Sequence, residues 1–308
     1  MSPDGLHWRD ARNLTWPYTA GCDKPSCPHQ KYDTHQNLFW DASKNKYLAT
    51  TRDLRPFPWR SVAIAESYPG EFAWNTTDAP PSVEQGTANE QPYAQITFPY
   101  YGIYLGLVAV NDAEYEQTKG DVHLRLSWSP DAETWHWVDK GGLTGKDFIP
   151  LGTPTPGDPN PFDSHIIFGT AYPIKMKDDA SVRLYYMGGN GPHSGPRNSS
   201  FALANLRPDG FVAVSGSGIV RTVPIRCTAQ TLVVTTDVED GGSVRVGVAG
   251  VVGLGPSDAT AVTGNVTDRA VAFPAAAPGA LGKLVGKDVV LELVIDRAKV
   301  FIVGFQRD

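Results

Sequence analysis

Charged residues and long apolar runs are scarce in this sequence. Asp, Glu, Lys and Arg make up 19% of the 308 residues, and the formal net charge is −6 at pH 7. An acidic chain without a basic run does not fit a nucleic-acid partner or a membrane surface. No apolar run approaches the roughly 20 residues that span a bilayer. We therefore predict neither partner, and the sequence does not indicate the oligomeric state.

Cysteines are also few, and the three present cannot build a disulfide framework. Cys22 and Cys27 are close enough to bridge the turn between them, which leaves Cys227 single, and three free thiols are equally compatible. His29 and His35 lie near this pair, but no second cluster of metal ligands supports a zinc site. We predict no metal and no cofactor.

Four Asn-X-Ser/Thr sequons are present, which indicates an extracellular or secretory-pathway protein: they begin at Asn13, Asn75, Asn198 and Asn265. No signal peptide is recognisable at the N-terminus. The opening turn, Pro3-Asp4-Gly5, also lacks a strand before it. We expect a chain that begins part-way through its first domain.

Turn formers and aromatic residues are abundant, with 31 Gly, 25 Pro and 10% aromatics, and no long window has helical periodicity. Turns that lead into an aromatic residue recur at Trp8, Trp74, Trp135 and Phe211, about 60 to 75 residues apart. A four-stranded propeller blade with its loops has that length. The sequence predicts an all-β fold: a five-bladed-type β-propeller over 1–214, incomplete at its N-terminus, with three blades and the tail of another.

The segment 215–308 has no Trp, and its composition differs from that of residues 1–214. Its alternating Val, Thr and Gly residues predict four strands of a β-sandwich, at Thr231–Thr236, Ser243–Val248, Asp288–Ile295 and Lys299–Phe305. Few of its polar residues cluster, so we interpret this segment as structural support.

Each predicted blade has an acid where its first strand begins, namely Asp33, Glu90 and Asp163. The first strands of a propeller line its central channel, so these acids are expected to meet in one pocket and to be catalytic. Each of them taken alone could instead cap a turn. Glu90 lies in a loop before its strand, which makes Asp112 and Asp121 alternatives to it.

The ends of the second strands reach the same edge of each sheet as the starts of the first strands. Several polar residues at these ends are therefore predicted to bind substrate: His35, Asn37, Arg52, Asp53, Asp112, His165, Asn190 and His193. A pocket of carboxylates, amides, histidines and aromatic walls suits a carbohydrate. Two paired acids in it could cleave a glycosidic bond.

Several motifs resemble the propeller repeats of glycoside hydrolases related to families 32, 43 and 68, and above all the family 32 N-terminal-like group. They are Asp33-Thr-His-Gln-Asn-Leu-Phe-Trp-Asp41, Thr51-Arg-Asp53, Arg60-Ser-Val-Ala-Ile-Ala-Glu-Ser67, Phe162-Asp163-Ser164 and Asn190-Gly-Pro-His193. The resemblance implies a five-bladed glycosidase with three axial acids, and it favours furanosides as substrates. A Glu-Cys acid/base motif is missing. The alternatives are a non-catalytic carbohydrate-binding propeller, an inactive truncated homologue, or a purely structural or adhesive propeller.

Overall fold

The computed structural model describes His7 and residues 35–53, 59–69, 75–76, 83, 86–87, 89–112, 120–139, 141, 145–170 and 172–306. In these residues the helices are two short 3₁₀ turns, η2 (Pro256–Asp258) and η3 (Leu281–Leu284), and the rest is strands and their connections. The predicted all-β class is confirmed. The chain divides into two compact units, one within Met1–Pro173 and Leu184–Ala204 and the other within Ile174–Arg183 and Asn205–Asp308. The predicted domain boundary at residue 214 stays a prediction.

The first sheet is an antiparallel meander in the order β1 (Asn37–Asp41), β2 (Lys46–Asp53), β3 (Ser61–Ser67) and β4 (Asn75–Thr76). Burial alternates along β1, so that Phe39 faces the core and Trp40 faces solvent. β1 and β2 form a hairpin with Asp41 opposite Lys46, as expected for two β-forming runs on either side of the polar turn Lys44-Asn45-Lys46.

The second meander contains β5 (Glu90–Tyr100), β6 (Ile103–Asp112), β7 (Val122–Ser129) and β8 (His136–Trp137). The register between β5 and β6 shifts between Pro92 and Ala94, which leaves Tyr93 in a bulge. Proline donates no backbone hydrogen bond and is found in strands mainly at edges and bulges. The interruption therefore follows from the sequence at this point.

The third meander consists of β9 (Ile166–Gly169) and β10 (Ile174–Lys175), which pair with successive parts of β11 (Val182–Gly189), and of β12 (Ser199–Leu206) beyond them. One parallel pair, Val122 with Ile166, joins it to the second meander.

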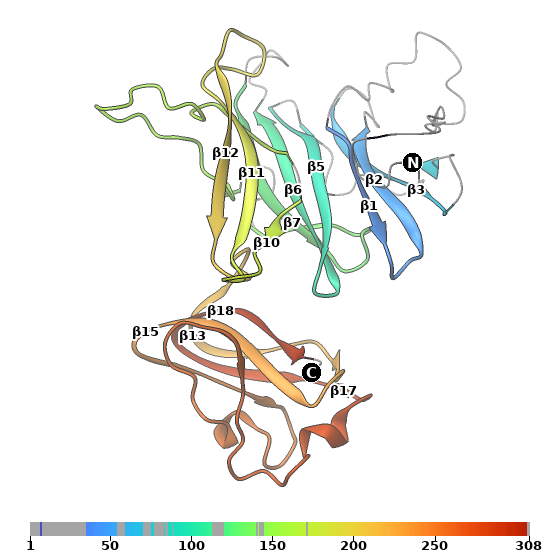
Figure 1. The fold of residues 1–308 in the computed structure, drawn as a ribbon, viewed down its shortest axis with the longest axis vertical. Coiled ribbons are helices and arrows are strands. Elements are labelled where there is room, and N and C mark those ends of the chain that lie inside the picture. Colours follow the sequence, from blue (N-terminus) through green and yellow to red (C-terminus); the bar gives the residue numbers. More distant parts are fainter. Residues whose placement is uncertain are drawn as a thin grey trace. The chain divides into compact units, whose positions relative to one another are not determined.

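Successive antiparallel meanders are the repeat of a β-propeller, and this unit has that type of fold (Figure 1). The first two meanders are joined by buried hydrogen bonds. The Thr97 amide donates to Asn37 Oδ1 at 2.8 Å, and the Thr50 hydroxyl donates to the Gln95 carbonyl oxygen at 2.6 Å.

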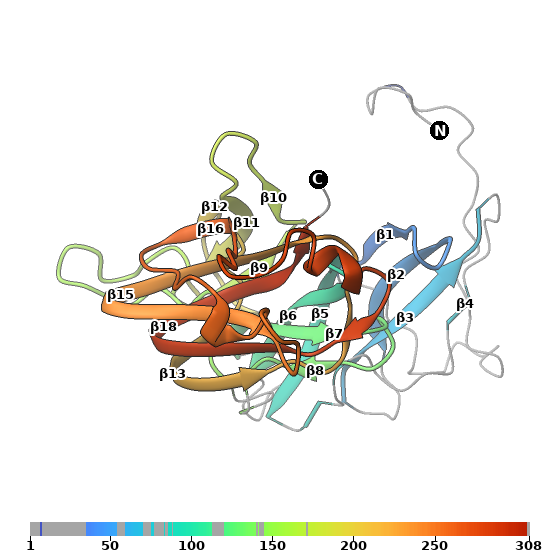
Figure 2. The same cartoon turned by 90° about the horizontal axis from the view of Figure 1, so that it is seen from below.

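The C-terminal β-sandwich is built on one long antiparallel pair, β15 (Thr231–Val248) and β18 (Leu291–Gln306), which run side by side (Figure 2). β13 (Val214–Arg221) and β16 (Val266–Ala270) extend this sheet, and β14 (Ile225–Arg226) pairs with β17 (Asp288–Val289). The sequence-based expectation of separate strands at 231–236 and 243–248, and at 288–295 and 299–305, is wrong in this respect.

Both strands continue because their polar interruptions lie opposite each other in the sheet. The pairing of β15 with β18 is irregular between Val238 and Ser243, and Arg297 opposite this break has a φ of +46°. The Arg297 guanidinium donates to the carbonyl oxygens of Asp240 and Gly241 at 3.0 and 2.5 Å. These bonds satisfy the backbone at the break, so each strand bends and continues where the sequence pattern suggested a turn.

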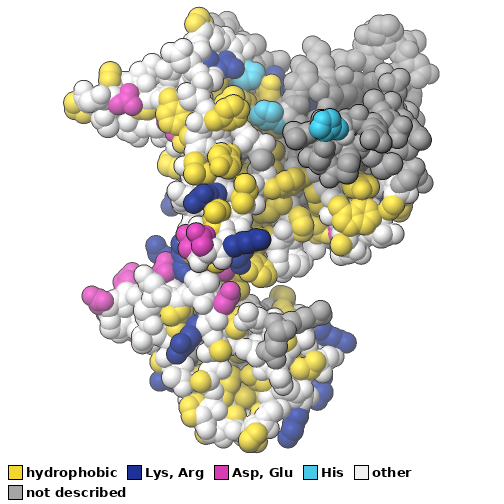
Figure 3. All heavy atoms as spheres, viewed as in Figure 1, with side chains coloured by type: hydrophobic (Ala, Val, Ile, Leu, Met, Phe, Trp, Pro, Cys, Tyr) yellow, Lys and Arg dark blue, Asp and Glu magenta, His cyan; other side chains and the backbone are white. Residues whose placement is uncertain are grey.

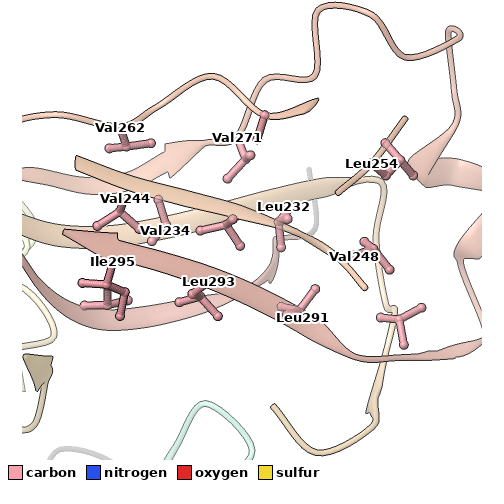
Figure 4. Close-up of a cluster of buried hydrophobic side chains, with 14 of the residues drawn as sticks. Leu232, Val234, Val244, Val248, Leu254, Val262, Val271, Leu291, Leu293 and Ile295 are labelled. Carbon is pink, nitrogen blue, oxygen red and sulfur yellow. The ribbon is translucent and has the colours of Figure 1, made fainter. Parts of the chain in front are cut away.

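The core of the sandwich is a cluster of branched aliphatic side chains (Figure 4). Leu232, Val234, Val244, Val246 and Leu291 are fully buried in it. Apolar burial of this kind is the main favourable contribution to folding.

Candidate functional site

Strand pairing places the starts of the first strands and the ends of the second strands together in all three meanders. Asn37 lies opposite Thr50, Glu90 opposite Asp112, and Ile166 opposite Gly189. The hairpin turns of β1–β2 and β5–β6 lie at the other end of the unit, which is the lower end in Figure 1. We call the end at which the first strands begin the mouth.

Tyr93 is the point at which the three meanders meet. Its ring centre lies 4.7 Å from the guanidinium carbon of Arg52 and 5.3 Å from that of Arg60, both from the first meander. The rings of Phe168 and His193, from the third meander, lie 5.6 and 4.9 Å away. Bulges often re-aim a side chain near a functional site, and the bulge in β5 adds this aromatic ring to the mouth.

Two histidines adjoin this aromatic group. The His35 ring meets Phe168 edge-on at 4.9 Å, and burial lowers the pKa of His35. Burial also lowers the pKa of His193, with further contributions from the positive charges of Arg60, Arg197 and Arg52. Both imidazoles are therefore mainly uncharged at neutral pH. Histidine and cationic side chains lie close together on one face of this unit (Figure 3).

Two buried amides lie opposite each other beside Tyr93. Gln91 on β5 pairs across the sheet with Asn111 on β6, and these residues are 1% and 0% exposed. Arg60 Nη1 donates to Gln91 Oε1 at 2.7 Å. Within the described part of the chain, Nε2 of Gln91 and both amide atoms of Asn111 have no hydrogen-bond partner. Buried polar atoms without partners are rare and tend to occur at sites with a function.

An accessible Asp–His pair lies between the second and third meanders. His165 Nδ1 is 2.7 Å from Asp121 Oδ1, and the side chains are 43% and 36% exposed. Two backbone hydrogen bonds join the meanders beside this pair: Val122 N donates to the His165 oxygen, and His193 N donates to the Gly120 oxygen. The Asp121 carboxylate accepts a hydrogen bond from Nδ1 of His165 and so holds the ring in one orientation. Nε2 is then the nitrogen that can exchange a proton with a ligand.

Glu90 points away from these groups, because successive residues of a strand face opposite sides and Gln91 faces Asn111. Its Oε1 lies 3.8 Å from Nη1 of Arg125 on β7, whose Nε lies 3.5 Å from Asp147. His123 Nδ1 is 2.9 Å from the other oxygen of Asp147. Glu90 therefore belongs to a largely buried ion network on the other face of the sheet.

This ion network predicts that the stability of the propeller-type unit depends on pH. The hydrogen bond to Asp147, which outweighs the opposing effect of burial, raises the pKa of His123 above 6.5. A raised pKa contributes stability that is complete below about pH 6.5 and is lost as pH rises through the folded-state pKa. We expect an NMR titration of the folded chain to give His123 a pKa above that of histidine in an unstructured peptide. We also expect the fall in unfolding free energy above pH 6.5 to shrink in His123→Gln; an unchanged pH profile would contradict this role.

Asp163 also lies away from Tyr93. Its Oδ2 accepts a hydrogen bond of 2.9 Å from the Tyr186 hydroxyl. Burial and then this carboxylate raise the pKa of Tyr186 to about 12. Tyr186 and Met187 are successive residues of β11 and face opposite sides, and Met187 packs in the cluster that contains Tyr93. The catalytic role of Asp163 stays a prediction, and its contacts are those of a carboxylate that holds a tyrosine in place.

The other predicted substrate ligands make backbone contacts or lie outside the described residues. Asn37 binds the Thr97 amide, and Asn190 Oδ1 accepts from the Asn198 amide at 2.9 Å. The Asp112 amide donates to the Asp121 carbonyl oxygen at 2.8 Å. Asp53 pairs with Ser61 in the sheet. Its side chain is not described, and Asp33, Cys22, Cys27 and His29 lie outside the described residues.

Two further observations concern the described residues only. Their His, Cys, Asp and Glu side chains form no group of three or more that could hold a metal ion. None of their helices is both long enough and apolar enough to cross a membrane. Cys227 is a buried free thiol in the sandwich.

Sequence reasoning missed Tyr93, Arg60 and Phe168 as members of this site. A signal for Tyr93 was available, because Pro92 within an apolar strand indicates a bulge. Arg60 directly precedes a third strand, and third strands start at the same end as first strands. Phe168 looked like an ordinary core residue, since its contact with His35 joins segments more than a hundred residues apart.

No protein-family model matches the sequence, and no curated protein sequence is significantly similar to it. Solved structures show a distant likeness. An N-acetylgalactosamine deacetylase from F. plautii, in complex with blood group B trisaccharide, is 12% identical with a TM-score of 0.42, and the match covers 58% of this chain and 51% of that chain. This chain thus spans about half the length of the deacetylase.

Two other similar structures are glycoside hydrolases. A family 117 enzyme from Zobellia galactanivorans is 14% identical with a TM-score of 0.39, and the match covers 85% of this chain and 84% of that one. A family 32 β-fructofuranosidase from Bombyx mori is 9% identical with a TM-score of 0.32, covering 88% and 78%. Likeness at this level carries no information on the activity of this chain.

Proposed function

We propose that the propeller-type unit binds a carbohydrate at its mouth and hydrolyses a glycosidic bond there. The observation that carries this proposal is the meeting of side chains from three meanders around Tyr93. An aromatic face, amides, guanidinium groups and imidazoles are the groups with which proteins hold a ring that carries many hydroxyls.

Hydrolysis needs one group that protonates the leaving oxygen and a second that attacks carbon or activates water. We assign the proton transfer to His165, held by Asp121, because the pair is accessible and adjoins the loop of His193. Asp33, two residues before His35, is the proposed second acid. Asp163 and Glu90 remain candidates from the sequence, and a furanoside substrate rests on the family resemblance alone.

A second candidate function is carbohydrate binding without catalysis. It is favoured by the contacts of two predicted catalytic acids, since Glu90 lies near Arg125 and Asp163 accepts a hydrogen bond from Tyr186. In that case the mouth would keep its binding groups and lack a working acid pair.

Variants of the Asp–His pair separate the two candidates. If His165 transfers a proton, His165→Gln and Asp121→Asn each lower kcat/KM on aryl furanosides or pyranosides by about 10²–10⁴. The matched control is His136→Gln, because His136 is an exposed histidine whose ring contacts Trp128 away from the mouth. Full turnover in both variants would remove the pair from the mechanism. Sugar binding without any turnover in the unaltered chain would favour the binding protein.

A further inference from the structure

Three arginines lie at the mouth. Arg52, at the end of β2, and Arg60, just before β3, place their guanidinium groups over the Tyr93 ring. Arg197, between β11 and β12, is held in place because its Nη1 donates to the carbonyl oxygens of Pro192 and His193 at 3.1 and 2.5 Å. Three guanidinium groups thus come from two meanders to one site.

These three groups act on a common point. After burial, the positive charges of Arg60, Arg197 and Arg52 are the causes that lower the pKa of His193. The His193 imidazole, which meets the Tyr93 ring edge-on, therefore experiences a positive field from all of them. An anionic group placed at this point would experience the same field as attraction.

The hydrogen-bond donors of these arginines also indicate an anionic ligand. A guanidinium group has five N–H donors and no acceptor, and its planar fork matches the two oxygens of a carboxylate or a sulfate. The acceptor oxygen of Gln91 is already bound by Arg60. The guanidinium groups around Tyr93 are therefore suited to a ligand that presents several acceptor oxygens.

We propose that the sugar unit bound beside Tyr93 carries an acidic group, a carboxylate or a sulfate ester, which Arg60 and Arg197 hold. This assignment rests on the proposed carbohydrate function of the same site and adds the class of substrate to it. Arg52, which is 6% exposed, supports the Tyr93 ring from within the sheet.

The test measures binding of three oligosaccharides of equal length to the full chain by titration calorimetry. They are an oligogalacturonide, a sulfated galacto-oligosaccharide and a neutral galacto-oligosaccharide. We expect one or both acidic ligands to bind at least about ten-fold more tightly than the neutral one, a difference of ~1.4 kcal/mol. Added NaCl should reduce this preference, because salt screens exposed charges.

Arg60→Gln and Arg197→Gln should each remove most of the preference for the acidic ligand, whereas Arg221→Gln should leave it unchanged. Arg221 is a matched control because its exposed guanidinium pairs with Glu292 in the sandwich. Arg197 is also exposed, so its variant keeps the test valid if Arg60→Gln does not fold. Equal or tighter binding of the neutral ligand overturns the acidic-sugar assignment and leaves carbohydrate binding standing. Failure of all three ligands to bind overturns both proposals.

Discussion

Replacing Gly247 with alanine is expected to destabilise the C-terminal β-sandwich by about 3 kcal/mol. A Cβ atom at this position in β15 would lie 2.3 Å from the backbone carbon of Gly255 and 2.3 Å from the nitrogen of Pro256. Both neighbours are backbone atoms, which cannot rotate away as a flexible side chain can. The segment before η2 would have to leave the strand, and with it Leu254 would leave the core.

Gly304 provides the matched control, because it lies on β18, the strand that pairs with β15, and a Cβ atom there meets nothing within 4 Å. Gly304→Ala should change the unfolding free energy by less than about 1 kcal/mol. All eight tryptophans lie at or before residue 137, so their fluorescence reports the propeller-type unit alone. In Gly247→Ala, the urea midpoint measured by far-UV circular dichroism should fall, while the midpoint measured by tryptophan fluorescence should not change. An unshifted dichroism transition would show that the segment at Gly255 can move aside at little cost.

The second large effect is expected in the other unit, where Arg125→Met should cost about 3 kcal/mol. The Arg125 side chain is 8% exposed and lies between Glu90 and Asp147, each 18% exposed. Removing the cation leaves two largely buried carboxylates on one face of the sheet without the charge between them. Breaking a buried ion pair by removing one partner is costly for this reason.

Arg226→Met is the comparison for this change. Arg226 pairs with Asp288 at 3.1 Å, but their side chains are 63% and 62% exposed, so its removal should cost less than about 1 kcal/mol. Tryptophan fluorescence during urea unfolding measures the Arg125 variant, and circular dichroism measures the Arg226 variant. Similar small losses in both would mean that Glu90 and Asp147 are stabilised without Arg125.

The sequence predicts the strands well where burial alternates and a turn follows at once. The hairpin of β1 and β2 is an example, because Phe39 and Leu48 face the core and a polar turn closes at Asp41. The apolar, β-forming runs at residues 104–110, 121–127 and 182–187 predict three more strands, and β6, β7 and β11 match them to within two residues. The prediction is wrong at β15 and β18, where it places a turn in each strand. Arg297 on β18 binds the backbone carbonyl oxygens at the polar interruption of β15, and a contact between residues so far apart in sequence is not visible in the pattern.

The candidate site was harder to predict than the strands. Pairing places the predicted residues at one end of each meander, and His35, Arg52 and His193 meet there through Phe168 and Tyr93. Which face each side chain takes depends on register. A difference of one residue separates Gln91, beside Tyr93, from Glu90 on the opposite face. The interpretation of Asp163 depends in the same way on Tyr186 facing away from Met187.

The bulge in β5 has an evolutionary consequence. Gln91 and Ala94 keep regular partners in Asn111 and Ala109 on either side of it, so Tyr93 is one residue more than the pairing needs. Loss or gain of a single codon here would remove or restore the aromatic ring without reversing the orientation of any neighbour. Related proteins could therefore differ in the ligands that they bind through the insertion or deletion of one residue in β5. The backbone pairs on either side of Tyr93 would stay the same.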